Sequence, residues 1–270
     1  MLFAVPNVSE GRDPQAVEAI GAAFAAPEGV RLLDTHTVPD HHRSVYWLAG
    51  GAGQLAEAIV RGAREVLARV DLVKPRGVHP HVGALDVAPI VFATADLRGA
   101  ACAEALLTAG RLGDELGLPV YLYGALAGGR TRAELRRAEA LATTPPEFGP
   151  SVIDPRHGAT LVAARPPLVA FNFAIDGDVE LARAAAARVR DLPGVVALGL
   201  WLESAGVAQV SCNVEDPTAT PLARVLQEVR AYARVREAEL VGLAPAAAFA
   251  GWPDDVPIRN RRTLEEVLGS

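Results

Sequence analysis

Histidines gather in three short polar segments of this chain, where their side chains could act as acid, base or metal ligand. All six lie in DTHTVPDHHRS (residues 34–44), RGVHPHVGALD (76–86) and FGPSVIDPRHG (148–158). A fourth polar segment, PNVSEGRD, spans residues 6–13. Histidine titrates near neutral pH and suits all three roles. Because these segments adjoin predicted strands and do not follow a helical face, we expect them to share one active cleft.

His79 is the best candidate for a general base. Gly77 permits a tight backbone, and Pro80 restricts His79 to an extended conformation, so the turn can hold the imidazole without a helix around it. A positioned histidine accelerates proton transfer by on the order of 10²–10⁴-fold. His81 is interpreted as a neighbour that lines the pocket, and Asp86 as a strand residue with no assigned role.

A metal site is the first alternative. Nitrogen and oxygen ligands are available in the side chains of His41, His42, His79, His81, Asp34, Asp40 and Asp86. Adjacent histidines on an extended chain point to opposite sides, however, and the proline of His-Pro-His interrupts strand geometry. No HExxH motif is present. The sequence favours no metal, but a metal-assisted amidohydrolase remains the alternative enzyme.

Nucleophilic catalysis and nucleotide binding have weaker support. The chain has no GxSxG motif, and its two cysteines, Cys102 and Cys212, lie in no motif with a histidine. The glycine-rich turns GGAG (50–53) and GALAGGR (124–130) match neither GxGxxG nor a phosphate-binding loop. General acid–base chemistry is therefore the preferred reading.

Composition limits the partners. The chain has 270 residues, 50% of them hydrophobic, and a net charge of −6, which argues against broad nucleic-acid binding. It has no apolar run of membrane-spanning length, and its start lacks the basic flank and apolar run of a signal peptide. With two cysteines only, these features predict a cytoplasmic protein that acts on small molecules.

The elements that must position these residues alternate between strand and helix. Asp13 and Pro14 predict a helix start, and Gly117 a helix end. The periodicity predicts strands over 2–8, 29–35, 43–50, 84–92, 119–124, 167–175, 195–204 and 207–214, and helices over 12–26, 53–69, 96–116, 131–143, 178–190 and 219–236. Ala205 and Gly206 predict a hairpin between the last two strands. The expected fold class is α/β (α+β), in two halves, residues 1–164 and 165–270.

Several strings occur in the order found in one known family. They include VPNVSEGRD, KPRGVHPHVGALDVAPIV, LGLPVYLYG, FGPSVIDPRHGAT and VVALGLWLESAGVAQVSCNVED. With them the chain resembles the glutamate formiminotransferases, including the transferase part of formiminotransferase–cyclodeaminases. The resemblance covers residues 3 to about 245. The chain ends where a cyclodeaminase would begin, so only the transfer step is expected.

The resemblance implies an activity and a site. The family transfers a formimino group from N-formimino-L-glutamate to N5 of the co-substrate tetrahydrofolate, a step of histidine breakdown. The histidine of its GxHP motif, the catalytic base, falls on His79. It also implies two similar subdomains with mixed sheets facing each other and helices outside, and a homodimer. Its folate-binding segment corresponds to Gly149, Pro150, Ser151, Val152, Ile153, Asp154, Pro155, Arg156, His157 and Gly158.

Both substrates carry carboxylates, for which Arg43 and Arg156 are candidate partners. Side-chain amides on or beside strands are candidates to read the pterin ring, namely those of Asn7, Asn172, Gln209 and Asn213.

Three residues differ from the pattern of the resembled family. Its members often have an acidic residue at the position of His36, an asparagine at that of His42 and an acidic residue at that of Val78. These changes bear on the pKa of His79 and on the donor, for which formylglutamate is a related choice. They also leave open a folate-binding protein without turnover.

Overall fold

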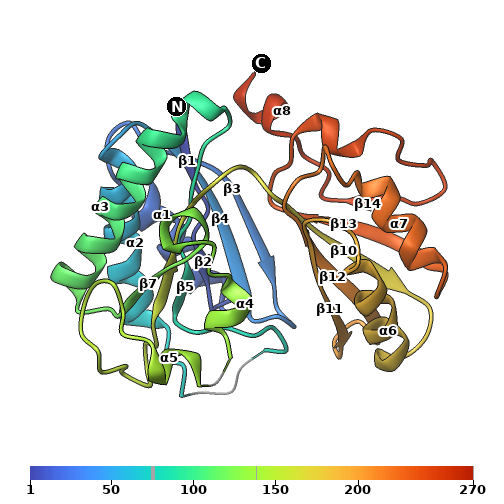
Figure 1. Ribbon diagram of the computed structural model, residues 1–270, viewed down its shortest axis with the longest axis horizontal. Helices are drawn as coiled ribbons and strands as arrows, with labels where there is room; N and C mark the ends of the chain where they lie inside the picture. Colours follow the sequence, from blue (N-terminus) through green and yellow to red (C-terminus); the bar gives the residue numbers. More distant parts are fainter. Residues whose placement is uncertain (74–76, 138, 270) are drawn as a thin grey trace. The chain divides into compact units, whose positions relative to one another are not determined.

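The computed structural model describes residues 1–73, 77–137 and 139–269. Its contacts divide the chain into two compact units, Met1–Pro166 and Pro167–Ser270. Each unit has its own β-sheet and its own hydrophobic core, so each is described by itself (Figure 1).

The described part of the first unit forms a nine-stranded mixed sheet. Its strands are β1 (Leu2–Ala4), β2 (Asn7–Val8), β3 (Arg31–Val38), β4 (Arg43–Gly50), β5 (Leu85–Val87), β6 (Ile90–Val91), β7 (Val120–Leu122), β8 (Thr160–Val162) and β9 (Ala164–Arg165). The order is β7-β8-β5-β2-β4-β1-β6-β9, with β3 paired to β4. Strands β1 to β6 pair antiparallel, whereas β8 and β9 join β5, β6 and β7 in parallel.

Three long helices cover one face of this sheet (Figure 1). They are α1 (Pro14–Ala25), α2 (Gln54–Arg69) and α3 (Arg98–Leu116). The predicted caps are confirmed: the Asp13 carboxylate accepts from two backbone N–H groups at the start of α1, and Gly117 ends α3 with φ 62°. The buried core between helices and sheet includes Ile20 and Leu48.

Two predicted strands are interrupted. The expected strand over 2–8 divides into β1 and β2 around Val5-Pro6, and that over 84–92 divides into β5 and β6 around Ala88-Pro89. Proline has no N–H to donate to a ladder. The chain nevertheless stays within the sheet, because the Val5 N–H donates to the Pro89 carbonyl at 3.0 Å.

The single helix predicted over 131–143 is wrong. The structure has two short helices, α4 (Arg132–Leu135) and α5 (Ala140–Thr143). Leu135 is buried against Tyr121 on the sheet face opposite the long helices. The next residue, Arg136, pairs with the buried carboxylate of Asp86 in β5. These tertiary contacts outweigh local helix propensity.

The described part of the second unit has a five-stranded sheet in the order β11-β12-β10-β13-β14. Its elements are β10 (Val169–Ile175), α6 (Val179–Val189), β11 (Val195–Leu202), β12 (Val207–Val214), α7 (Leu222–Arg230), β13 (Val235–Val241), β14 (Ile258–Arg259) and α8 (Leu264–Leu268). Short 3₁₀ turns occupy Ala95–Leu97, Gly124–Ala127 and Ala246–Phe249 of the chain.

The predicted hairpin is confirmed, since β11 and β12 pair antiparallel from Leu202 opposite Val207. The helix predicted over 219–236 is too long. It begins after Pro221 and ends at Arg230, because the chain then enters β13, which pairs with β10 in the centre of the sheet.

Both units contain the same strand–helix–strand–strand–helix–strand arrangement. In the first unit the interrupted strand β1–β2 lies between β4 on one side and the interrupted strand β5–β6 on the other. In the second unit β10 lies between β12 and β13. This is the split βαβ order. The expected α/β class with two mixed sheets is confirmed.

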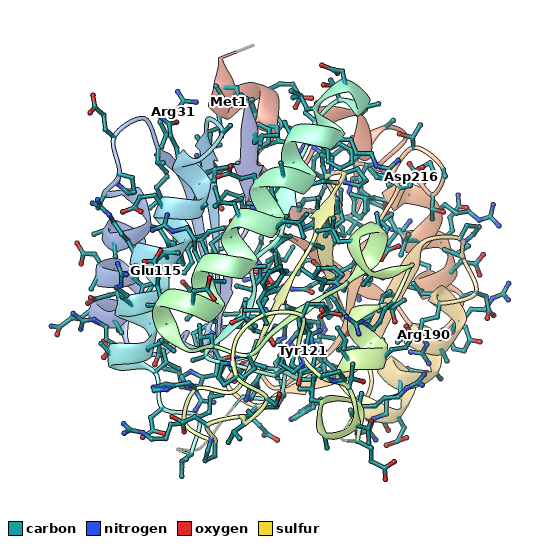
Figure 2. The ribbon with its side chains drawn as sticks, turned by 60° about the vertical axis from the view of Figure 1, so that its left-hand side comes forward. Met1, Arg31, Glu115, Tyr121, Arg190 and Asp216 are labelled. Atoms are coloured by element: carbon teal, nitrogen blue, oxygen red, sulfur yellow. The ribbon has the colours of Figure 1, made fainter. Side chains whose placement is uncertain are left out.

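Charged side chains project from the outside of each unit, as Arg31, Glu115, Arg190 and Asp216 do in Figure 2. In the part of the chain that is described, no helix is both long and apolar enough to cross a membrane.

Candidate active site

A fully buried carboxylate, that of Asp86, is the centre of the polar cluster in the first unit. Asn7 and Val8 of β2 oppose Val87 and Leu85 of β5, so Asp86 is the extra residue of a β-bulge. A bulge re-aims a side chain relative to the regular ladder. The Val82 N–H donates to Asp86 Oδ1 at 2.8 Å, which fastens the turn containing His79 to this carboxylate.

Arg43, at the start of β4, is held by two partners. Its Nη1 donates to Asp86 Oδ2 at 2.7 Å, and its Nε and Nη2 donate to the Asn7 side-chain oxygen at 3.1 and 2.7 Å. Asn7 in turn donates to the Val5 carbonyl at 2.8 Å. The predicted binding residues Asn7 and Arg43 are thus brought together, and they organise each other.

Arg136 is the second cation on Asp86. Its Nη2 donates to Asp86 Oδ2 at 2.6 Å across 50 positions of sequence. Although burial opposes ionisation, the charges of Arg43 and Arg136 hold the pKa of Asp86 well below its usual range. Asp86, which the sequence left without a role, is therefore an ionised anchor for two guanidinium groups.

The His79 ring is held in one tautomer. Its Nδ1 lies 2.7 Å from the Pro80 carbonyl oxygen, which can only accept a hydrogen bond, so Nδ1 carries the hydrogen. In the neutral ring the lone pair is then on Nε2. Burial, followed by the charges of Arg43 and Arg136, lowers the pKa of His79 well below its ordinary value, against the opposing charge of Asp86. His79 is consequently a neutral proton acceptor at pH 7.

Two glycines let the His79 turn approach its neighbours. A Cβ on Gly77 would lie 2.3 Å from the His41 carbonyl carbon, and one on Gly83 would lie 1.9 Å from the Ala159 carbonyl oxygen. Backbone atoms cannot yield at these distances. The turn is therefore packed between the segments 34–44 and 148–158.

His41 and His81 lie beside His79, and His36 and His42 belong to the same segment as His41. The ring of buried His41 has its centroid 5.6 Å from that of His79. His42 adopts φ 49°, and its Nδ1 accepts from the Gly11 N–H at 3.3 Å. His36 belongs to β3 and not to the predicted loop, since that strand continues to Val38. The His81 Nδ1 lies 3.4 Å from the His79 carbonyl oxygen.

His42 has a backbone conformation that few residues adopt readily. Positive φ is uncommon outside glycine, but asparagine and histidine are among the residues that adopt it most readily. Both asparagine and histidine therefore satisfy the backbone of this turn. Burial lowers the pKa of His42, and the charge of Glu10 opposes that shift.

The segment Gly149–Gly158 is an exposed loop that ends against the His79 turn. The Arg156 side chain is 63% exposed. The two ring nitrogens of His157 are occupied, Nε2 with the Leu67 carbonyl at 3.1 Å and Nδ1 with the Asp154 carboxylate at 3.2 Å. His157 thus orders the loop, and Arg156 is its exposed cation.

The remaining predicted residues belong to the second unit. Phe171 faces the core of that unit, so Asn172 lies on the opposite face of β10, where it donates to Glu239 at 3.1 Å. Gln209 and Asn213 share this face, because both alternate with core residues of β12 and Asn172 is opposite Ser211. The three amides therefore line one sheet face.

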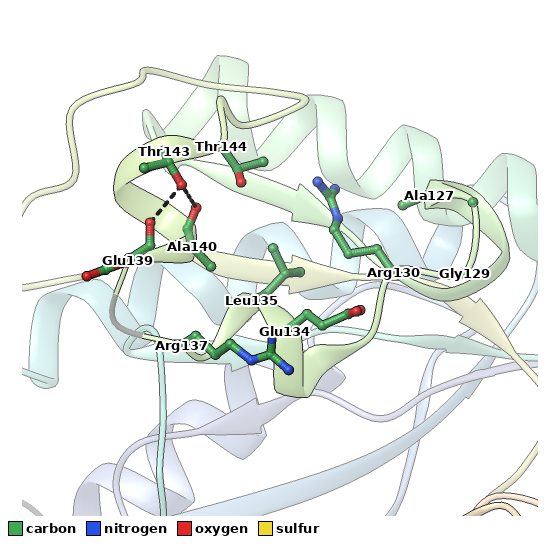
Figure 3. Close-up of a pocket in the computed structure, with 11 residues that line it drawn as sticks. Ala127, Gly129, Arg130, Glu134, Leu135, Arg137, Glu139, Ala140, Thr143 and Thr144 are labelled. Atoms are coloured by element: carbon green, nitrogen blue, oxygen red, sulfur yellow. Dashed lines mark hydrogen bonds between the residues drawn. The ribbon is translucent and has the colours of Figure 1, made fainter.

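Two cavities of the first unit are lined by none of these residues. One, of about 890 Å³, is bounded by the 127–130 turn, α4 and α5, and Figure 3 shows Arg130, Glu134 and Arg137 at its border. The other, of about 680 Å³, lies between α1 and β3. Within the described ranges, no group of three or more His, Cys, Asp or Glu side chains is placed to hold a metal ion.

Fold and site together define a two-unit α/β protein in which a histidine turn is bonded to a buried carboxylate that pairs with two arginines. Residues 1–165 match the N-terminal subdomain of the formiminotransferase domain, and residues 170–252 match the formiminotransferase domain. The chain belongs to the formiminotransferase family.

Three relatives illustrate this membership. The chain is 36% identical over 275 residues to the formimidoyltransferase-cyclodeaminase of Mus musculus, covering 91% of this chain and 50% of that protein. It is 33% identical to the glutamate formimidoyltransferase of Streptococcus pyogenes serotype M1 and 32% to that of Thermoplasma acidophilum, covering 89% and 88% of those proteins. The chain spans about half the length of the bifunctional relatives it matches.

Sequence reasoning missed Arg136 and the role of Asp86. Arg136 lies in a segment whose pattern is that of an ordinary exposed helix, and nothing local distinguishes it from Arg137. Asp86 did carry a signal: it is a lone charge inside the apolar run ALDVAPIVF. A carboxylate in such a run requires a buried partner.

Proposed function

We propose that this chain transfers the formimino group of N-formimino-L-glutamate to N5 of tetrahydrofolate, giving 5-formiminotetrahydrofolate and glutamate. The proposal rests on one observation above all. Burial, followed by the neighbouring cations, lowers the pKa of His79, and the Pro80 carbonyl leaves the lone pair of the neutral ring on Nε2. Membership of the formiminotransferase family supports a transfer of this kind.

The reaction requires a proton to move between two nitrogens. N5 attacks the amidine carbon, which forms the new C–N bond and a tetrahedral intermediate. His79 Nε2 accepts the proton from N5 and returns it to the glutamate nitrogen as that C–N bond breaks. Atoms and charge balance without a further reactant, so one histidine serves as base and then as acid.

The folate is proposed to bind against Gly149–Gly158, with Arg156 as a contact for a carboxylate. That loop joins the His79 turn at the bridge between Gly83 and Gly158, which supports its assignment. The amides of Asn172, Gln209 and Asn213 are proposed to read donors and acceptors of the pterin. The chain is further proposed to act in histidine breakdown, in the cytoplasm, as a homodimer.

Replacing His79 tests the proposal. In His79→Gln the ring base is absent, and we expect kcat for formimino transfer to fall by on the order of 10²–10⁴-fold, with folate binding retained. The measurement is steady-state formation of 5-formiminotetrahydrofolate together with a folate-binding titration. Undiminished transfer in a folded variant contradicts the role of His79.

The same assay separates the other two readings. A metal-assisted amidohydrolase would lose activity on chelation, regain it with zinc, and release ammonia or formate without folate. A folate-binding protein without turnover would bind tetrahydrofolate and form no product with either formiminoglutamate or formylglutamate as donor. The proposed transferase forms product after chelation and requires the folate.

A further inference from the structure

The cluster around Asp86 carries one more positive charge than negative. Guanidinium groups stay protonated, so Arg43 and Arg136 contribute two positive charges, and ionised Asp86 contributes one negative charge. Their side chains are 11%, 17% and 0% exposed. A net charge in such a place is unfavourable unless an opposite charge joins it.

The cluster also has more hydrogen-bond donors than acceptors. A guanidinium offers five N–H groups. Three nitrogens of Arg43 bond to Asn7 and Asp86, whereas Arg136 makes one such bond, from Nη2 to Asp86. The Arg136 Nε is buried and has no hydrogen-bond partner among the residues described. Because buried donors are normally paired, this guanidinium lacks an acceptor.

We infer that Arg136 binds the α-carboxylate of the formimino donor, and that Asp86 is the residue that positions Arg136 for it. The inference deepens the proposed function and rests on it. A planar guanidinium binds a carboxylate through two charge-assisted hydrogen bonds. One carboxylate would supply both the missing charge and the missing acceptor.

The position of the cluster identifies which carboxylate. In the donor, the α-carboxylate is attached to the carbon bearing the nitrogen that leaves, so it lies next to the reacting atoms. The glutamyl carboxylates of a folate are separated from N5 by the aminobenzoyl group. Arg136 shares Asp86 with the anchor of the His79 turn, since Val82 bonds to the same carboxylate. The charge of Arg136 also acts on the His79 ring, so a carboxylate next to the reacting atoms, that of the donor, matches this cation.

Donor binding would then tune the base. The groups acting on the His79 ring are Arg43, Arg136, Asp86 and His41. A carboxylate placed on Arg136 offsets one of the two charges that disfavour protonation of His79. The pKa of His79 should therefore be higher in the donor complex than in the free protein. Arg136 would thus couple binding of the donor to the pKa of His79.

The test compares three donors: N-formimino-L-glutamate, its α-amide and its γ-amide. For the wild-type chain we expect kcat/KM to fall about 10- to 100-fold with the α-amide, because a charge-assisted contact is lost, and to change less with the γ-amide. In Arg136→Met, kcat/KM for formiminoglutamate should fall to the level of the α-amide, with the KM for tetrahydrofolate unchanged. Arg136→Lys should recover part of the loss.

Arg137→Met is the matched control. Arg137 is an exposed neighbour in the same segment, at the border of the 890 Å³ cavity and away from Asp86. It should keep the wild-type preference for the α-carboxylate. A thermal unfolding scan of every variant checks that Arg136→Met is folded, as expected for a change that leaves Asp86 paired with Arg43.

The pH profile of the reaction is a second measurement, and it would not change if the role of Arg136 were purely structural. The acid limb of the pH profile of kcat reports the pKa of the base in the donor complex, and the acid limb of kcat/KM reports its pKa in the free protein. For the wild-type chain the kcat limb should lie at higher pH, and in Arg136→Met the two limbs should coincide. Retention of the α-carboxylate preference in folded Arg136→Met overturns the inference.

Failure of the proposed function has a different signature. If the wild-type chain forms no product, binding of N-formimino-L-glutamate and its α-amide is measured by calorimetry. If the wild-type chain binds the α-amide more weakly than N-formimino-L-glutamate, and Arg136→Met binds the two equally, the carboxylate site is supported although the proposed transfer reaction is wrong. Equal binding of both compounds to the wild-type chain overturns the site.

Discussion

At the scale of single residues, backbone, burial and charge together fix the state of one imidazole. The Pro80 carbonyl selects the tautomer of His79, and burial, followed by the charges of two guanidiniums, disfavours its protonated form. Because the pKa of His79 in the folded chain lies below 6.5, the unfolded chain binds the proton first as pH falls. His79 therefore removes stability below about pH 6.5, with no such effect above it.

A carboxylate beside His79 should shift its titration. Val78 is 44% exposed and directly precedes His79 in the sequence. In Val78→Glu the negative charge favours the imidazolium, so the acid limb of kcat/KM should move to higher pH by roughly half a unit at low salt. Val78→Gln is the control of similar size without charge. An equal shift in both variants would show that the charge is not responsible.

At the scale of elements, the site depends on segments that meet without regular pairing. The β-bulge at Asp86 aims its carboxylate, the break between α4 and α5 presents Arg136, and the loop ending at Gly158 supports the His79 turn. Each is an interruption of a helix or strand. Regular elements, by contrast, form the core beneath.

The contact between the His79 turn and the 148–158 loop can be tested with one methyl group. In Gly83→Ala the new Cβ would lie 1.9 Å from the Ala159 carbonyl oxygen, so the backbone must shift, at a cost of about 1–3 kcal/mol or more in the free energy of unfolding. Transfer activity should fall with it, because the turn moves.

Gly99→Ala is the opposite case. Gly99 lies in α3, where a Cβ would meet nothing within 4 Å, and alanine should stabilise the chain by up to about 1 kcal/mol. Urea denaturation of both variants measures the difference. Equal stabilities of the two would contradict the close packing around Gly83.

At the scale of the whole molecule, two units repeat one strand order with different side chains. The first unit holds the histidines and both arginines of the Asp86 cluster, and the second presents the Asn172, Gln209 and Asn213 amides on one sheet face. The net charge is −6, so the excess positive charge of the Asp86 cluster is local, and the chain as a whole does not attract anions.

The proposed homodimer is also a property of this scale. The chain has a mass of 28.2 kDa. We expect light scattering after gel filtration to give twice that mass, independent of tetrahydrofolate. A mass equal to one chain at micromolar concentration would contradict the dimer, without bearing on the chemistry of His79.

Local sequence signals by themselves determined much of the framework. The cap at Asp13, the end of α3 at Gly117 and the hairpin between β11 and β12 all depend on nearby residues, so their patterns can be read directly. Tertiary structure alone decided that Arg43 and Arg136 meet on Asp86, 43 and 50 positions away. Such pairing depends on a bulge and on where separate segments pack, and no local propensity encodes the cost of leaving a buried charge unpaired.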